Sequence, residues 1–150
     1  MKTRDLALNG IFMALYVALI TFIPSFGPLQ FRIGEALCVM PFYNRKFVPA
    51  FVLGGILANL SSPLGTVDMV VGGLCAAITY TISYFVKRPY INGVTYAVVS
   101  GVLVAAELYI IQQTPLLLSF GGVAGSMIVI QLGAVACVEH TGLKEIITRG

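Results

Sequence analysis

Five polar side chains with the chemistry to contact a ligand occur in a chain that is otherwise strongly apolar. They are Arg32, Glu35, Asn59, Asp68 and Glu107. Carboxylates accept charge-assisted hydrogen bonds from amines and ring N–H groups, whereas a guanidinium or an amide donates to a carbonyl. Only 10% of the residues are charged, and 58% are hydrophobic. Three acids against one arginine predict a negative site that suits a cationic or donor-rich ligand.

The elements that must position these residues are apolar runs. About 20 helical residues cross a hydrocarbon layer of about 30 Å. The runs predict an all-α integral membrane protein, with residues 1–150 forming one transmembrane substrate-binding domain. We expect a six-helix bundle in which the second and third helices are short, as is typical of segments that line a cavity. The expected helices are 6–23, 33–43, 47–61, 67–86, 93–111 and 116–138, and the first is interpreted as a retained span.

The basic residues predict how the chain crosses the membrane. With a cytoplasmic N-terminus, the outer connections contain only Arg32, and the inner connections contain all the other basic residues. Those residues are Lys2, Arg4, Arg45, Lys46, Lys87, Arg88, Lys144 and Arg149. This positive-inside bias predicts a multi-pass protein of the cell membrane with both termini in the cytoplasm. Because the basic residues form no continuous patch, no nucleic-acid partner is expected.

This topology brings the five polar residues to a similar depth on the outer side, from four different helices. Each has a structural alternative. Glu35 and Asp68 are equally compatible with complementing helix dipoles, and Arg32 with Glu35 fits a structural i, i+3 pair. Asn59 would also satisfy the open end of a helix. Glu107 favours a functional role most strongly, because its own helix offers it no cation and a carboxylate within a span is costly.

Aromatic residues at a similar depth are candidates for stacking on a flat ring. They are Phe31, Tyr109 and Phe120, although such residues more often belong to the interfacial belt or the core. The three cysteines lie within apolar runs and are interpreted as core residues, so no metal site is expected. The sequence contains no Walker A motif, no H-E-x-x-H motif and no Ser-His-acid set, so we expect neither an ATP site nor an enzyme.

Small residues recur every four positions on three of the expected helices. The sets are Gly10, Ala14 and Ala18; Ala97, Gly101 and Ala105; and Gly121 with Gly125. Such faces allow helices to approach closely. Packing within the bundle is expected for the fifth and sixth helices.

Several stretches together resemble a known family. The stretches are 30–37, Pro41-Phe42, Leu57-Ala58-Asn59-Leu60, and Gly65 followed by Asp68 and Gly72-Gly73. They resemble the QueT-type substrate-binding S-components of energy-coupling-factor (ECF) transporters, which are assigned to queuosine precursors. The resemblance covers nearly the whole chain.

The resemblance implies a protein that captures a deazaguanine, of the preQ1 type, from outside the cell. It also implies a transmembrane coupling subunit and two ATPase subunits as partners, which would hydrolyse the ATP, and no cofactor in this chain. In S-components an A-x-x-x-A face of the first helix meets the coupling subunit, and Ala14 and Ala18 fit that pattern. The resemblance assigns no ligand contacts. An S-component for another vitamin or nucleobase, and less favourably a membrane-embedded enzyme or a structural subunit, remain as alternatives.

Overall fold

The computed structural model describes residues 2–23 and 31–149. Pro24, Gly27 and Pro28 predict a loop after the first helix, and this loop lies outside the described ranges. Gln30, the first residue of the stretch 30–37 that resembles the QueT-type family, also lies outside them. Every element of the described chain is helical. In chain order the elements are α1 (Thr3–Phe22), the 3-10 segment η1 (Ile33–Val39), α2 (Met40–Tyr43), η2 (Arg45–Phe47), α3 (Val48–Leu57), α4 (Thr66–Phe85), α5 (Pro89–Gln112), α6 (Leu116–His140) and α7 (Leu143–Arg149).

Four of these helices, α1, α4, α5 and α6, are long and apolar enough to cross a membrane. The all-α prediction is therefore confirmed for the described residues, with four candidate membrane spans, but the count of six regular helices is not. The expected second helix is a 3-10 segment followed by the single turn α2. The expected third helix ends early, because the Asn59 side chain donates to the Gly55 carbonyl (2.8 Å) and the following backbone forms turns toward Pro63.

Two local features differ from what the residue types predict. Thr66 precedes the expected fourth helix (67–86) and is by type a good helix cap, but it is the first residue of α4; Gly65 occupies the cap position with φ 59°, which glycine adopts without strain. The residues after the expected sixth helix (116–138) are largely polar and predict a tail without structure, but they contain the helix α7. Ile147 of α7 is buried in the core, and the Asn44 side chain donates to its carbonyl at 2.9 Å. The tail is therefore docked onto the bundle.

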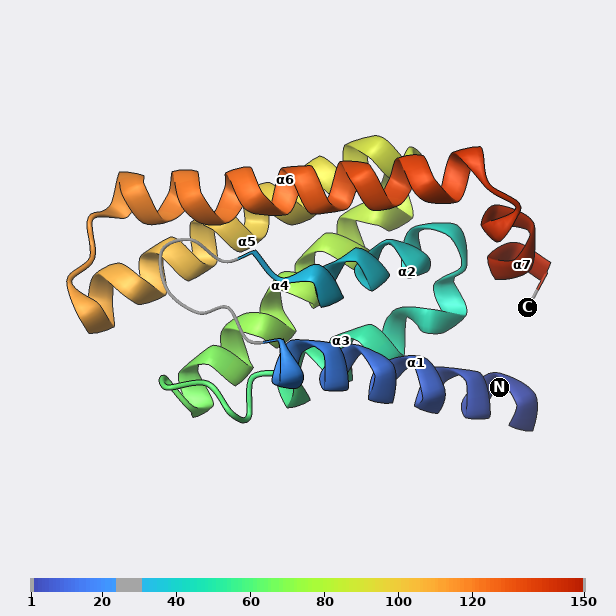
Figure 1. The fold of residues 1–150 in the computed structure, drawn as a ribbon, viewed down its shortest axis with the longest axis horizontal. Helices are drawn as coiled ribbons and strands as arrows, with labels where there is room; N and C mark the ends of the chain where they lie inside the picture. The colour runs from blue at the N-terminus through green and yellow to red at the C-terminus, as the bar shows by residue number, and fades with distance from the viewer. Residues whose placement is uncertain (1, 24–30, 150) are drawn as a thin grey trace.

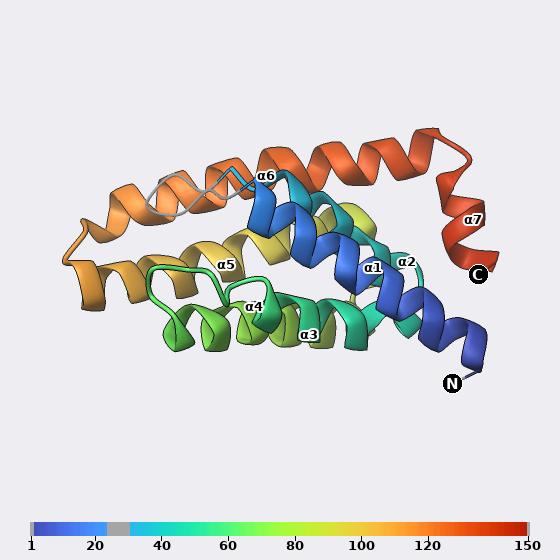
Figure 2. The ribbon, with the colours of Figure 1, turned by 60° about the horizontal axis from the view of Figure 1, so that its bottom comes forward.

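Figures 1 and 2 show how the elements are arranged. Helices α5 and α6 form an antiparallel pair, and α3 packs against both α1 and α4. The η1 segment lies between α1 and α6 and contacts both. Both ends of the described chain lie at the same end of the bundle, together with the α2–α3 turn and the α4–α5 junction (Figure 1). All the basic residues except Arg32 belong to these segments.

The three small-residue faces have different environments. A Cβ added at Gly101 would lie 2.8 Å from the Cβ of Ala124, so the α5 face packs on α6 as expected. The prediction for the sixth helix is wrong, because a Cβ at Gly121 or Gly125 would meet no atom of the described chain within 4 Å. The α1 face is also uncovered: Gly10 has no such neighbour and Ala14 is exposed. Only 17% of the α1 span is buried, against 39–44% for the other three spans.

Helices α3 and α4 approach each other closely at Gly55 and Gly72. A Cβ at Gly72 would lie 2.5 Å from the Gly55 carbonyl oxygen and would also collide with the Asn59 amide. Gly72→Ala should therefore lower the melting temperature in detergent by several degrees, because overpacking costs roughly 1–3 kcal/mol. Gly121→Ala, which adds the same methyl group to open space on another helix, is the matched control. A Gly72→Ala protein as stable as this control would contradict the close contact.

Candidate ligand-binding site

A small polar cavity lies where α1, η1, the α3–α4 turn, α4, α5 and α6 meet. Its volume is about 30 Å³, which accommodates only a few water molecules. The polar part of the lining is formed by Tyr16, Arg32, Glu35, Asn59, Asp68, Tyr96 and Ser100, and the remainder by Val71, Gly72, Cys75, Val104 and Met127. A purine-sized ligand requires more space, so side chains must move when such a ligand enters.

The structure brings the five predicted polar residues together. Arg32, Glu35, Asn59 and Asp68 line the cavity directly, although they come from three separate segments. Glu107 is not in the lining, but its carboxylate lies within electrostatic reach of Asp68 and Arg32. All five side chains are buried, with 3–6% of each residue exposed. The five polar residues that are predicted to lie at a similar depth therefore also lie close together in the structure.

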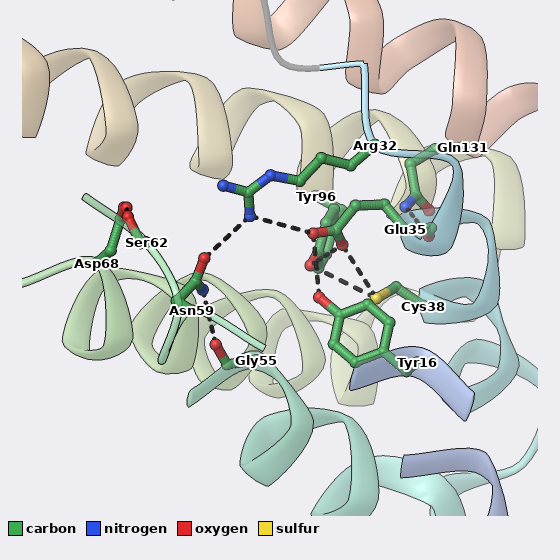
Figure 3. A network of polar contacts seen from close by, with 10 residues as sticks. All are labelled: Tyr16, Arg32, Glu35, Cys38, Gly55, Asn59, Ser62, Asp68, Tyr96 and Gln131. Atoms are coloured by element: carbon green, nitrogen blue, oxygen red, sulfur yellow. Dashed lines mark hydrogen bonds and ion pairs between the residues drawn. The ribbon is translucent and has the colours of Figure 1, made fainter. Parts of the chain in front are cut away.

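The Glu35 carboxylate has a complete set of partners (Figure 3). Tyr16 donates to Oε1 at 3.0 Å, and Tyr96 donates to Oε2 at 2.8 Å. The Cys38 thiol also donates to Oε2, at 3.2 Å, and the Arg32 guanidinium forms an ion pair with Oε1 at 4.0 Å. These contacts join η1 to α1 and α5. The Glu35 carboxylate therefore has a structural role, because its partners hold these elements together.

The Arg32 side chain extends from the start of η1 toward the end of α3. Its Nη1 donates to Asn59 Oδ1 at 3.1 Å, while the Asn59 amide nitrogen is held by the Gly55 carbonyl. Figure 3 shows the guanidinium between Asn59 and Glu35. The arrangement fixes the Asn59 oxygen toward the guanidinium and places one positive charge in the lining of the cavity.

Asp68 lies in the first turn of α4 and accepts a hydrogen bond from the Ser62 hydroxyl, which in turn accepts from the Leu64 backbone N–H. This position near the positive end of the α4 dipole stabilises a carboxylate, so the structural alternative for Asp68 fits the geometry as well. One oxygen of Asp68 is engaged by Ser62. Asp68 also lines the cavity, as Arg32 does.

Glu107 is the exception among the buried acids. Neither carboxylate oxygen has a hydrogen-bond partner within the described chain, although the residue is only 4% exposed. A buried carboxylate without donors costs free energy, and its nearest charged neighbour, Asp68, has the same sign. The site therefore has acceptor capacity that the protein itself does not use. This is the chemistry expected of a site for a ligand that carries hydrogen-bond donors.

The predicted stacking residues lie away from the cavity. Phe31 and Tyr109 are about half exposed, and Phe120 packs near Gly101 where α5 meets α6. The rings that do line the cavity are Tyr16 and Tyr96. Sequence reasoning did not single these out, although a tyrosine in the interior of an apolar span signals a hydroxyl that needs a partner.

Comparisons with known proteins agree with the resemblance seen in the sequence. The model of the QueT transporter family matches residues 6–139. The queuosine precursor transporter QueT of Lactococcus lactis subsp. cremoris (strain MG1363) is 32% identical over 142 aligned residues, covering 82% of this chain and 83% of that protein. No solved structure matches the chain. Because the family match covers most of the described helices and the cavity that they enclose, the chain belongs to the QueT transporter family.

Proposed function

We propose that this chain is the substrate-binding S-component of an ECF-type importer and that it captures a queuosine precursor, a deazaguanine of the preQ1 type. Membership of the QueT transporter family and the similarity to the Lactococcus queuosine precursor transporter support this proposal. The observation that carries it is the unpartnered, buried carboxylate of Glu107 beside Asp68. In this role the chain binds and releases its ligand and catalyses no reaction.

The chemistry of such a ligand matches the free acceptors. A deazaguanine presents a ring N–H and an exocyclic amine along one edge, and a carboxylate accepts both as a pair. The aminomethyl group of preQ1 is cationic near neutral pH and needs a second acceptor. Glu107 and Asp68 supply these two acceptors, since Glu35 is already occupied by its tyrosine and thiol donors. Arg32 or the amide of Asn59 then donates to the ring carbonyl.

The size of the cavity determines how this ligand enters. A volume of about 30 Å³ is far smaller than a bicyclic base, so the Arg32 side chain, which crosses the cavity, has to swing aside. The guanidinium donates to Asn59 Oδ1 and pairs with the Glu35 carboxylate. When the guanidinium moves, a donor of the ligand takes its place at Asn59 and Glu35 keeps its tyrosine and thiol donors, which limits the cost of moving a buried charge.

The uncovered α1 face fits the role of a docking surface. Gly10 and Ala14 leave a flat strip that nothing in the described chain covers, and small residues allow a partner helix to approach closely. We assign this strip, with Ala18, to the transmembrane coupling subunit. Two ATPase subunits complete the transporter and supply the energy, because this chain has no nucleotide-binding motif of its own.

The first prediction tests the ligand contact. Glu107→Gln should weaken preQ1 binding about 10- to 150-fold, because one charge-assisted hydrogen bond contributes roughly 1.5–3 kcal/mol. Calorimetry on the purified wild type and variant measures this change. The melting temperature should stay the same or rise, because the variant replaces a buried acid, which has no hydrogen-bond partner in the described chain and lies beside Asp68, by a neutral amide of the same size. Unchanged affinity would show that Glu107 does not contact the ligand. If the wild type bound another donor-rich base more tightly than preQ1, the proposed substrate would be wrong.

Glu35→Gln is the matched comparison. The same chemical change here removes the ion pair with Arg32 and leaves one acceptor oxygen for the Tyr16, Tyr96 and Cys38 donors, and breaking a buried pair costs about 3–5 kcal/mol. The melting temperature should therefore fall clearly in Glu35→Gln and not in Glu107→Gln. Equal stability of the two variants would contradict the division of the acids into a structural and a ligand-binding group.

A second prediction concerns the coupling subunit. Ala14→Trp places a bulky side chain on the uncovered strip and should abolish most uptake in cells, while preQ1 binding by the isolated chain persists. Val129→Trp, at a position of α6 that is 63% exposed, is the control and should leave both unchanged. Loss of ligand binding in Ala14→Trp would show instead that the strip packs within the bundle.

A third prediction concerns orientation. The end of the bundle that carries both termini and eight basic residues should face the cytoplasm. A cysteine at the exposed Ser61 should react with an impermeant thiol reagent added outside intact cells, and a cysteine at Arg88 should react only after the membrane is opened. Wild-type protein controls for the native cysteines. Labelling of the Arg88→Cys variant from outside would show that the topology is the reverse of the one proposed.

A further inference from the structure

A second hollow lies at the end of the bundle that carries both termini. It has a volume of about 370 Å³, which is much larger than the cavity around Arg32. Its walls come from α2, the α4–α5 junction, the end of α6 and α7. The polar side chains that line it are Tyr43, Arg45, Ser83, Lys87, Glu139, Lys144 and Thr148. We call this hollow the basic pocket.

The charges of the basic pocket favour an anion. Three basic side chains face one acid, and that acid is already satisfied: Tyr43 donates to Glu139 at 3.0 Å, and Lys144 donates to it at 3.0 Å. No hydrogen bond or ion pair joins Lys87 to the rest of the described chain. Pro89, which begins the 24-residue helix α5, also lines the pocket and brings the positive end of the α5 dipole to it.

An apolar groove of about 440 Å³ continues from this region along the outer face of α5. It is lined by Tyr90, Ile91, Val94, Thr95, Val98 and Val99 of α5 with Leu132 of α6. Tyr90, at its start, lies within electrostatic reach of Tyr43 of the basic pocket. Pro89 and Tyr90 are consecutive, so the first turn of α5 contributes to both hollows. A polar, positive pocket thus adjoins an apolar groove that follows a membrane span.

We propose that the basic pocket and the groove together bind one anionic phospholipid, with its phosphate among Arg45, Lys87 and Lys144 and one acyl chain along α5. A free phosphate would use only the pocket. An acidic protein segment would leave the groove unfilled. The proposal rests on the cytoplasmic orientation proposed above, because anionic headgroups of the cytoplasmic leaflet are attracted to basic residues at that surface.

Native mass spectrometry of the purified chain tests this site, with dioleoyl phosphatidylglycerol and dioleoyl phosphatidylcholine as probes. The wild type should retain phosphatidylglycerol in preference to phosphatidylcholine. Lys87→Gln should weaken phosphatidylglycerol binding about fivefold, which is the contribution of one basic residue near a membrane surface. Arg88→Gln is the matched control, because it removes the same charge from the next residue, which does not line the pocket; its binding should change less than twofold.

The groove is tested separately. Val94→Trp fills it and should weaken binding of both lipids, whereas Val102→Trp, at a 52% exposed position of α5 outside the groove, should not.

Equal losses in Lys87→Gln and Arg88→Gln would show a diffuse charge effect and overturn the proposal. Full displacement by sn-glycerol 3-phosphate would assign the pocket to a free anion, and equally tight binding of a polyglutamate peptide would assign it to a protein partner. Both results would also overturn it. PreQ1 affinity in detergent should be the same in all four variants, so the lipid site and the proposed function can fail independently.

Discussion

The carboxylate of Glu35 imposes the constraint on which this bundle depends. A charged group in an apolar interior opposes folding through its desolvation unless donors and a counter-charge compensate for it. Here the donors come from the middle of α1, from α5 and from η1 itself, and the charge is balanced by Arg32. Gln131 of α6 adds a hydrogen bond of 2.8 Å to the Glu35 carbonyl. One side chain and its backbone therefore hold four elements in register.

This constraint explains why a segment too short to span can lie inside the bundle. A 3-10 helix has poorer hydrogen bonds than an α-helix and is seldom stable over seven residues by itself. The η1 segment is stabilised by side chains from elsewhere, and the same contacts place Arg32 at the edge of the cavity. Because the protein's own donors saturate Glu35, the acceptors that remain for a ligand belong to Asp68 and Glu107. The proposed division into structural and ligand-binding acids thus follows from what surrounds each of them.

Sequence reasoning could predict what depends on composition and periodicity. Hydropathy indicated all four long spans, and the polar residues placed at one depth do converge on one cavity. It could not predict η1, because its partners Tyr16, Tyr96 and Gln131 lie 19, 61 and 96 residues away from Glu35. Helix α7 was missed for the same reason, since its docking depends on Asn44, 103 residues away. The open surroundings of Gly121 likewise depend on which side of α6 the neighbouring helices occupy.

The formal net charge of +3 conceals two regions of opposite sign. Around the cavity three carboxylates outnumber Arg32, whereas the segments at the other end carry eight basic residues and only three acids. The lining residues of the two hollows follow this division, with carboxylates in excess in one and basic side chains in excess in the other. The site proposed for a cationic base and the site proposed for an anionic headgroup therefore lie in regions of opposite charge. The same asymmetry on which the proposed orientation rests thus also separates the two proposed sites.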